Sequence, residues 1–216
     1  MEILRRRQSK GTLRTVWRED DQIVKEFRIV SWPPDFRRPW RREHKALDRL
    51  NRRGVFAPTT YGFRSLRPGV VQYRRQYIAG ELLQKNCENR SKDLPAHFAA
   101  IHAVGVTNGD AALDNILVTE GKQFVLIDYG RARIALIKGP LFYLNVGKEL
   151  ARIRRSIFGN DAAQWKRFCE VYTRIAVHPP WAWHVIHRAL FYWLRRWRVG
   201  RSIESRRFTS DRSDKS

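Results

Sequence analysis

Three polar residues, Asp110, Asn115 and Asp128, are spaced so that they could act together on a phosphate group. Two short apolar runs lie between the second and the third, at residues 116–118 and 124–127, and a polar turn containing a glycine joins them. This pattern predicts a β-hairpin that brings the three side chains to one edge. Phosphoryl transfer needs such a set, because one carboxylate orients a hydroxyl while an amide and a second carboxylate hold Mg²⁺ on ATP.

The composition indicates a basic protein with a sizeable core. The chain has 216 residues, of which 43% are hydrophobic and 12% aromatic. That is enough for one domain, or for two small lobes that share a cleft. Lys and Arg total 43 against 21 Asp and Glu, so the formal net charge is +22. Such a charge attracts polyanions, which include nucleic acid, an anionic membrane surface and a phosphorylated substrate.

Cysteine usage and the absence of a signal-peptide pattern predict a cytoplasmic protein. The only cysteines are Cys87 and Cys169, far apart and in no C-x-x-C motif. Isolated thiols of this kind are typical of a reducing compartment. No apolar run approaches the roughly 20 residues needed to span a bilayer, although contact with a membrane surface stays open.

A lysine lies on the apolar face of an expected strand. Residues 3–7, 13–19 and 22–29 are predicted to form three strands. In the third strand, Lys25 shares one face with Ile23 and Phe27 by period-2 alternation. An unpaired ammonium group there would be costly. Lys25 is therefore either a lysine that extends to the edge of the strand or a lysine that binds phosphate in a cleft.

A glutamate on the next predicted helix is the natural partner of Lys25. Residues 31–39 form a proline-broken linker, and residues 41–53 have the periodicity of a helix. Glu43 lies on the same inward stripe as Ala46 and Leu47. A buried acid needs a cation, and Lys25 is the candidate. The alternative is an ordinary glutamate at a helix start, facing the helix dipole.

The remaining elements alternate between a few strands and a helical second half. Two strands are expected at 59–63 and 70–77, a flexible crossing at 78–80, helices at 91–104, 141–157, 162–177 and 181–199, and a disordered tail at 201–216. The chain therefore divides into a sheet-rich first part and a helical second part.

The order of these features resembles the protein-kinase-like superfamily. The residues that carry the resemblance are Lys25, Glu43, Asn115 and the stretches Asn108-Gly109-Asp110 and Asp128-Tyr129-Gly130, over about residues 11 to 157. The resemblance implies an α+β fold with two lobes. A small antiparallel-sheet N-lobe with one helix would span residues 1–78, a mainly helical C-lobe 79–200, and a disordered basic tail 201–216.

Within that superfamily, the details resemble the bacterial lipopolysaccharide core kinases, which phosphorylate heptose or 3-deoxy-manno-octulosonic acid. The supporting stretches are residues 11–16, 23–27, 108–110 and 148–156. The resemblance implies ATP and Mg²⁺ as cofactors and an anionic glycolipid, lipid A–core, as acceptor. It also implies a location on the cytoplasmic face of the inner membrane.

By the same resemblance, each candidate residue has an expected role. Asp110 would be catalytic and would accept a proton from the substrate hydroxyl or orient it, and Asn115 and Asp128 would be the metal ligands. The cofactor-binding residues would be Lys25, Glu43, Gly11 in the nucleotide-covering loop and Ile78 at the adenine-side hinge.

Several positions depart from the family pattern. Asn108 stands where a histidine is usual, and Ala112 where many protein kinases have a lysine. The nucleotide-covering loop keeps only Gly11. Arg131 and Arg133 are candidates to meet the γ-phosphate charge, or they are simply solvated.

Two features concern the acceptor. About ten residues separate Gly130 from the helix near Leu141, without the anchoring motif of a protein-kinase activation segment, which favours a small molecule or glycolipid over a peptide. The helix at 181–199 carries four tryptophans and several arginines and could lie at an anionic membrane interface. Alternatively, this helix packs on the second lobe and has a solvated basic edge.

The sequence leaves three hypotheses. The first is an ATP-dependent kinase that acts on a lipopolysaccharide inner-core sugar. The second is an atypical small serine/threonine protein kinase. The third is a non-catalytic kinase-like module that binds polyanions such as RNA.

Overall fold

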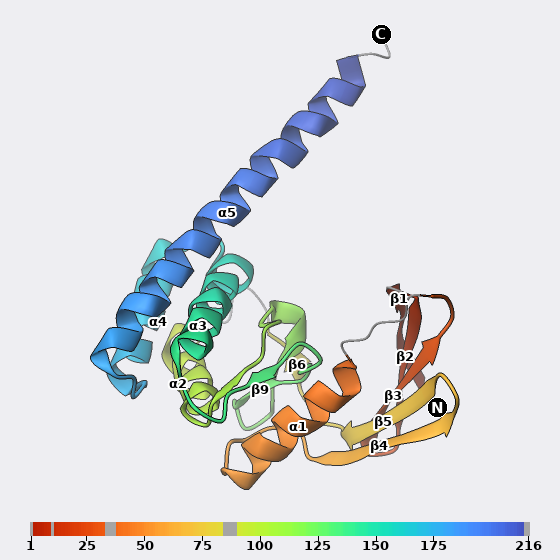
Figure 1. The fold of residues 1–216 in the computed structure, drawn as a ribbon. Helices are drawn as coiled ribbons and strands as arrows, with labels where there is room; N and C mark the ends of the chain where they lie inside the picture. Colours follow the sequence, from red (N-terminus) through yellow and green to blue (C-terminus); the bar gives the residue numbers. More distant parts are fainter. Residues whose placement is uncertain (1, 10, 33–37, 84–89, 214–216) are drawn as a thin grey trace.

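The computed structural model describes residues 2–9, 11–32, 38–83 and 90–213. A five-stranded antiparallel sheet with one helix comes first, and a mainly helical part follows it (Figure 1). The predicted α+β architecture, with a small sheet lobe and a helical lobe, is therefore confirmed. Cys87 and residues 33–37 of the predicted linker lie outside the described ranges.

The N-lobe sheet has the order β1-β2-β3-β5-β4, with every neighbouring pair antiparallel. Its strands are β1 Glu2–Ser9, β2 Thr12–Glu19, β3 Gln22–Ile29, β4 Thr60–Arg67 and β5 Val70–Gln76. The register pairs Val16 with Lys25 and Lys25 with Tyr73, so these three side chains form a row on one face. All three are buried. The predicted apolar face of β3 is thus confirmed.

A single helix covers this face. Helix α1 runs over Pro39–Arg52, with a proline in its first turn and Gly54 just after its end at φ 70°. Ala46, Leu47 and Leu50 are fully buried. Glu43 shares the buried stripe of this helix and is 1% exposed. The helix therefore delivers one acidic side chain to the inner face of the sheet.

The second lobe begins with short strands and continues as helices. Its elements are β6 Glu81–Leu82, α2 Arg90–Ala103, β7 Val106–Thr107, η1 Leu113–Asn115, β8 Ile116–Val118, β9 Phe124–Leu126, β10 Arg133–Ile134, α3 Pro140–Ile153, η2 Arg154–Phe158, α4 Ala162–Ile175 and α5 Pro180–Ser213. Strands β8 and β9 pair as an antiparallel hairpin. The predicted hairpin is confirmed.

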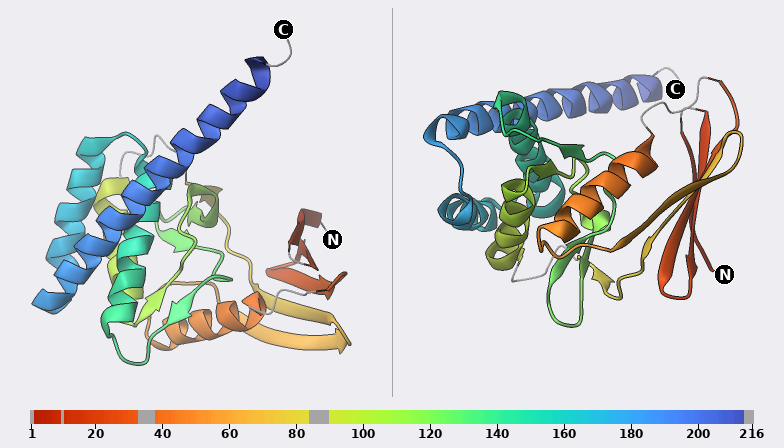
Figure 2. Two further views of the ribbon diagram at one scale, coloured as in Figure 1. Left: turned by 45° about the horizontal axis from the view of Figure 1, so that its top comes forward. Right: turned by 60° about the horizontal axis from the view of Figure 1, so that its bottom comes forward.

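Close packing of α3 against α5 organises the helical lobe (Figure 2). A Cβ atom added to Gly147 of α3 would lie 2.5 Å from the Ile186 carbonyl oxygen and 2.7 Å from the Ala189 Cβ atom. The absence of a side chain at Gly147 therefore sets the approach of the two helices. This packing fixes the stretch of α3 that reaches the cleft.

The end of the chain differs from the sequence prediction of a disordered tail over residues 201–216. Helix α5 continues to Ser213, well beyond its contact with α3 (Figures 1 and 2). After Gly200 the sequence contains neither glycine nor proline. Nothing in the local sequence ends the helix, although its composition is polar.

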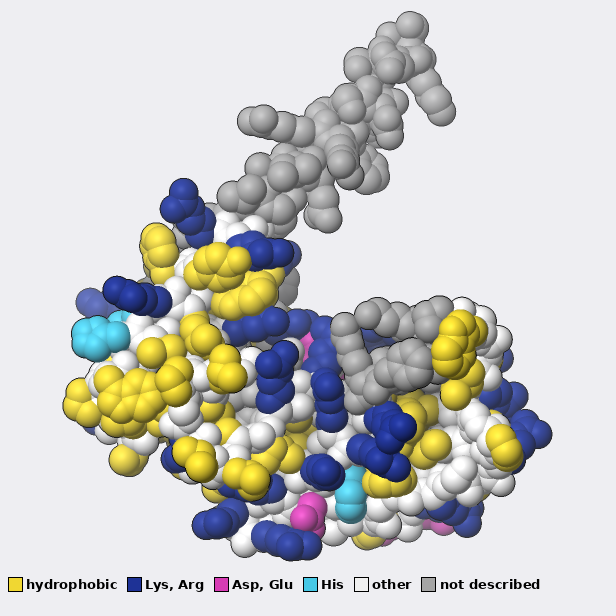
Figure 3. Space-filling view, viewed as in Figure 1, with side chains coloured by type: hydrophobic (Ala, Val, Ile, Leu, Met, Phe, Trp, Pro, Cys, Tyr) yellow, Lys and Arg dark blue, Asp and Glu magenta, His cyan; other side chains and the backbone are white. Residues whose placement is uncertain are grey.

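Basic side chains gather on the face that joins the two lobes. In Figure 3, Lys and Arg side chains surround the hollow between the sheet and the helices, and little Asp or Glu is visible there. The net charge of +22 is thus not spread evenly over the view. A polyanion that approaches this face would be attracted to the hollow.

A buried chain of hydrogen bonds in the second lobe makes its stability depend on pH. The Tyr172 hydroxyl lies 2.6 Å from His102 Nδ1 and 3.0 Å from His178 Nε2. Burial, together with the nearby His102, lowers the pKa of His178 to about 4. In the unfolded chain this pKa is about 6.5. Between about pH 6.5 and pH 4 the unfolded chain thus binds a proton that the folded chain excludes, and stability is lost as the pH falls.

We therefore expect His178→Gln to flatten the decline of the melting temperature between pH 7 and pH 4.5, measured by differential scanning fluorimetry. The slope should not disappear completely, because burial also lowers the pKa of His97 to about 4. His97 would therefore still make stability fall over the same pH range in the variant. His184→Gln on the exposed face of α5 is the control and should keep the wild-type slope. Equal slopes for wild type and His178→Gln would contradict this explanation.

Candidate active site

The loop after β7 carries the first of the three polar residues. Asn108 donates a hydrogen bond from Nδ2 to the Asp128 carbonyl oxygen (2.7 Å) and accepts one at Oδ1 from the Asp110 amide (2.8 Å). Gly109 has φ 73°, and an added Cβ atom would lie 2.7 Å from the Arg131 carbonyl oxygen, so a side chain would clash there. Asn108, the residue that departs from the family pattern, thus joins the Asp110 loop to the end of the hairpin.

The hairpin supplies the other two residues. Asn115 ends η1 just before β8 and donates from Nδ2 to the Asp110 carbonyl oxygen at 2.9 Å. Asp128 follows β9 two residues after Leu126. Asp110, Asn115 and Asp128 line one cavity. The prediction that all three meet at one edge is confirmed, and their individual roles stay predictions.

A buried ion pair lies behind this edge. Lys25 Nζ is 2.6 Å and 2.7 Å from the two carboxylate oxygens of Glu43, and the two side chains are 2% and 1% exposed. The expected partnership of Lys25 and Glu43 is therefore present. The two alternatives, a lysine that extends to the edge of the strand and an ordinary glutamate at a helix start facing the dipole, are wrong, because both charged groups are buried against each other.

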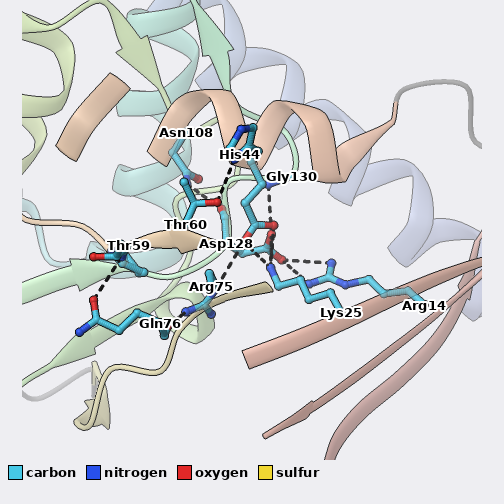
Figure 4. A network of polar contacts seen from close by, with 12 residues as sticks. Arg14, Lys25, His44, Thr59, Thr60, Arg75, Gln76, Asn108, Asp128 and Gly130 are labelled. Carbon is cyan, nitrogen blue, oxygen red and sulfur yellow. Dashed lines mark hydrogen bonds and ion pairs between the residues drawn. The ribbon is translucent and has the colours of Figure 1, made fainter. Parts of the chain in front are cut away.

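Glu43 has a second cation that the sequence analysis missed. Arg75 Nε lies 3.4 Å from Glu43 Oε1, and the Arg75 side chain is 6% exposed (Figure 4). Strand alternation places Arg75 on the same face of β5 as the buried Tyr73. The pattern that identified Lys25 would thus have identified Arg75 as well.

Asp128 lies between two cations. Lys25 Nζ is 3.6 Å from its Oδ1 atom, and both terminal nitrogens of Arg14 are 3.2 Å from Oδ2 (Figure 4). The Gly130 amide donates to Oδ1 at 3.1 Å. Burial alone would raise the pKa of Asp128, but Lys25, Arg14 and this amide lower it below its usual range. The carboxylate is therefore ionised at neutral pH.

Asp110 is also held by arginines. A terminal nitrogen of Arg152 forms an ion pair with its Oδ1 atom, and Arg131 Nε lies 3.7 Å from Oδ2. Arg131 was a candidate from the sequence, and it does reach the site. Arg152 comes from α3, inside the stretch 148–156 that supported the family resemblance. Arg133, the other candidate, is exposed on β10 and does not line this cavity.

A cavity of about 360 Å³ joins these groups to the N-lobe sheet. The lining residues from the N-lobe are Arg5, Arg7, Thr12, Arg14, Val16, Phe27 and Pro39. Those from the second lobe are Asp110, Asp114, Asn115, Asp128, Gly130, Arg131 and Arg152. Five arginines and three aspartates therefore line it. This volume and this charge fit a small anion with several negative charges.

None of the four predicted cofactor-binding residues lines this cavity: Lys25 and Glu43 form the buried pair behind it, and Gly11 and Ile78 lie elsewhere. Gly11 lies in the turn between β1 and β2 at φ 66°, and its carbonyl oxygen accepts hydrogen bonds from the Val30 and Ser31 amides at 2.8 Å and 3.2 Å. Ile78 is buried just after β5, with 9% of its surface exposed. Neither residue lines the cavity. Their expected roles in ATP binding stay predictions.

The donor set at the hairpin edge fits Mg²⁺. Since Nδ2 of Asn115 is engaged by a carbonyl, its amide oxygen is the atom left for a cation, beside the ionised Asp128. Mg²⁺ prefers such hard oxygen ligands and keeps several waters or phosphate oxygens. Over the described part of the chain, no cluster of three or more His, Cys, Asp and Glu side chains is arranged for a metal. Asn115 and Asp128 would thus hold the ion together with a nucleotide.

Comparison with known proteins identifies the fold and no family. No protein-family model and no curated protein matches the chain. An aminoglycoside phosphotransferase from Alicyclobacillus acidocaldarius superposes with a TM-score of 0.58 at 11% identity, over 89% of this chain and 80% of that one. The bifunctional kinase-methyltransferase WbdD matches with a TM-score of 0.48 at 14% identity, over 84% of this chain. This chain spans about half the length of the WbdD structure, 47% of it.

The chain thus has a protein-kinase-like fold, with a small antiparallel sheet over a mainly helical lobe. At these identities the comparisons support the fold alone. The case for an activity depends on the residues of the cavity.

Proposed function

We propose that this protein is an ATP-dependent kinase that transfers the γ-phosphate to an alcohol group. One observation carries the proposal: Asp110, Asn115 and Asp128 line a single cavity, and the buried pair Lys25–Glu43 lies directly behind it. These are the parts that phosphoryl transfer requires, a group to orient the hydroxyl, oxygen ligands for a metal and a cation for the phosphates.

Each side chain then has a defined task. Asp110, held by Arg131 and Arg152, orients the acceptor hydroxyl and accepts its proton. Lys25, held by Glu43, presents its ammonium group to the phosphates. Mg²⁺, bound by Asn115 and Asp128, would neutralise the charge that develops on the transferred group. The fold contributes positioning, since every one of these groups is fixed by a hydrogen bond or ion pair.

The acceptor we propose is a sugar of the lipopolysaccharide inner core, heptose or 3-deoxy-manno-octulosonic acid. The arginines around Asp110 favour an acceptor that is itself anionic, as lipid A–core is. The connection between Gly130 and Leu141 is short and contains only the two-residue strand β10. It therefore offers little surface on which a peptide could dock.

Such an acceptor would be reached at the cytoplasmic face of the inner membrane. No helix in the described part of the chain is long and apolar enough to cross a bilayer. Leu136, Ile137 and Leu141, in the connection before α3 and in its first turn, are 87%, 88% and 76% exposed, and Phe191 on α5 is 69% exposed. Apolar side chains beside so many cations favour peripheral contact with an anionic surface.

The tryptophans predicted to make that contact have another task. Trp193 lies under the Lys148 ammonium group at 4.3 Å, and Trp197 faces the Arg155 guanidinium at 5.6 Å. Trp181 contacts Tyr143, with ring centroids 5.1 Å apart. The alternative prediction, an aromatic helix packed on the second lobe, describes these side chains better.

The test is transfer of labelled γ-phosphate by the purified full chain with Mg²⁺. Lipid A–core with an unphosphorylated inner core, a mixture of serine/threonine peptides and no acceptor are compared in parallel. We expect label on lipid A–core alone, with one added phosphate located on a core sugar by mass spectrometry. Label on peptides would favour the protein-kinase alternative. Salt-sensitive RNA binding without transfer to any acceptor would favour the polyanion-binding module.

A further inference from the structure

The N-lobe strands place a row of arginines over the cavity. Arg7 of β1 pairs in register with Arg14 of β2, and Arg5 pairs with Val16. Residues paired across an antiparallel ladder lie on the same face, and Val16 in turn pairs with Lys25. Arg5, Arg7 and Arg14 therefore share the face of Lys25 and line the cavity. We call these three arginines the arginine roof.

The members of the roof have very different partners. Arg14 is paired with Asp128 at 3.2 Å and is 28% exposed. Within the part of the chain that the structure describes, Arg5 and Arg7 have no acidic partner. Both are exposed at the mouth of the cavity. Unpaired guanidinium groups on one strand face, at a cavity with the buried Lys25 behind its Asp128 wall, make an anion site of several positive charges.

In the described part of the turn between β1 and β2, Gly11 does not line the cavity. Cavity-lining residues of β1 and β2 are instead mainly arginines. A guanidinium group presents a planar fork of donors that matches phosphate oxygens, so it can replace backbone amides in this task.

We propose that the arginine roof binds the polyphosphate of the nucleotide, and that Arg14 moves from Asp128 to a phosphate when the nucleotide enters. The inference depends on the proposed function for the identity of the nucleotide, and it deepens it by assigning the phosphate contacts. Arg14 compensates the charge of the Asp128 carboxylate in the structure. Once Arg14 contacts a phosphate, Asp128 would be free to hold Mg²⁺.

This arrangement has a consequence for the order of binding. The Asp128 carboxylate already forms ion pairs with Arg14 and Lys25, so its negative charge is balanced before a metal ion binds. Phosphate oxygens, in contrast, meet the free guanidinium groups of Arg5 and Arg7 at once. The polyphosphate should therefore bind without Mg²⁺, and Mg²⁺ should bind well only together with it.

The experiment measures binding of ATP, inorganic triphosphate and adenosine by isothermal titration calorimetry of the full chain in EDTA. Arg7→Gln and Arg14→Gln are compared with wild type. Arg6→Gln is the matched control, because Arg6 lies on the same strand, pairs with Thr15 on the opposite face, and loses the same charge. Arg7 is exposed, so its variant should fold even if Arg14→Gln does not, and melting curves check both.

We expect wild type to bind ATP and triphosphate without metal. Arg7→Gln and Arg14→Gln should each weaken both by about tenfold, with adenosine binding unchanged, as for the loss of a charge-assisted contact. Arg6→Gln should remain within about twofold of wild type. The proposal that the arginine roof binds polyphosphate is wrong if wild type binds neither ATP nor triphosphate in EDTA, or if the Arg7→Gln and Arg14→Gln variants bind like wild type. It is also wrong if Arg6→Gln weakens binding as much as these two variants do.

The two proposals can fail separately. Arginine-dependent binding of ATP without transfer to any acceptor would contradict the kinase function and support polyphosphate binding by the arginine roof. Acceptor-dependent transfer, with unchanged ATP binding in Arg7→Gln and Arg14→Gln, would support the kinase function and contradict polyphosphate binding by the arginine roof.

Discussion

Asp110→Asn is expected to lower kcat for phosphoryl transfer by about a thousandfold, while ATP binding stays within about twofold of wild type. The amide keeps the shape of the side chain but cannot accept the proton of the acceptor hydroxyl. Asp110 does not contact Lys25 or Asp128 in the network of ion pairs, so the nucleotide side of the cavity should be unaffected. The measurement is ADP release in the presence and absence of the lipid A–core acceptor.

Stability should change little in this variant. Arg131 and Arg152 lose an anionic partner but are 54% and 34% exposed, so water can replace it. Asp48→Asn on the exposed side of α1 is a control with the same change of charge, and it should retain wild-type kcat. An Asp110→Asn protein with more than about a tenth of wild-type kcat would contradict the role of Asp110 as base.

Lys25→Met is expected to reduce both catalysis and stability. The nucleotide would lose its buried cation, so kcat/KM for ATP should fall by roughly a hundredfold or more. Of the cations that the structure describes in ion pairs with them, Glu43 would keep Arg75 at 3.4 Å and Asp128 would keep Arg14. Removing one partner of a buried ion pair costs about 3–5 kcal/mol, and the remaining arginines should hold the loss in the free energy of unfolding to the lower part of that range. Urea unfolding and steady-state ATP kinetics measure the two effects.

A double-mutant cycle with Glu43→Gln separates the pair from its surroundings. The two residues contact each other directly, so the stability losses of Lys25→Met and Glu43→Gln should not add. Glu43→Gln alone leaves Lys25 beside Asp128 at 3.6 Å and should therefore impair ATP use less than Lys25→Met. Additive stability losses, or normal ATP kinetics in Lys25→Met, would show that the pair does not support the site.

The local pattern of the sequence determined much of this protein. Strand alternation placed Lys25 on the buried face of β3, and the 3.6-residue period of the next helix placed Glu43 on its inward stripe. Two apolar runs around a short turn determined the β8–β9 hairpin and, with it, the meeting of Asp110, Asn115 and Asp128. Such features depend on neighbours along the chain, and periodicity reports them directly.

Contacts between distant segments were decided only by the tertiary structure. Arg14 meets Asp128 although 114 positions separate them, and Arg152 reaches Asp110 from α3. The course of α5 beyond Gly200 also differed from the sequence prediction. With arginine so frequent in this chain, periodicity can assign each one to a face of its own element. Which of them finds a carboxylate depends on how the two lobes close on each other, because that packing alone sets distances across the cleft.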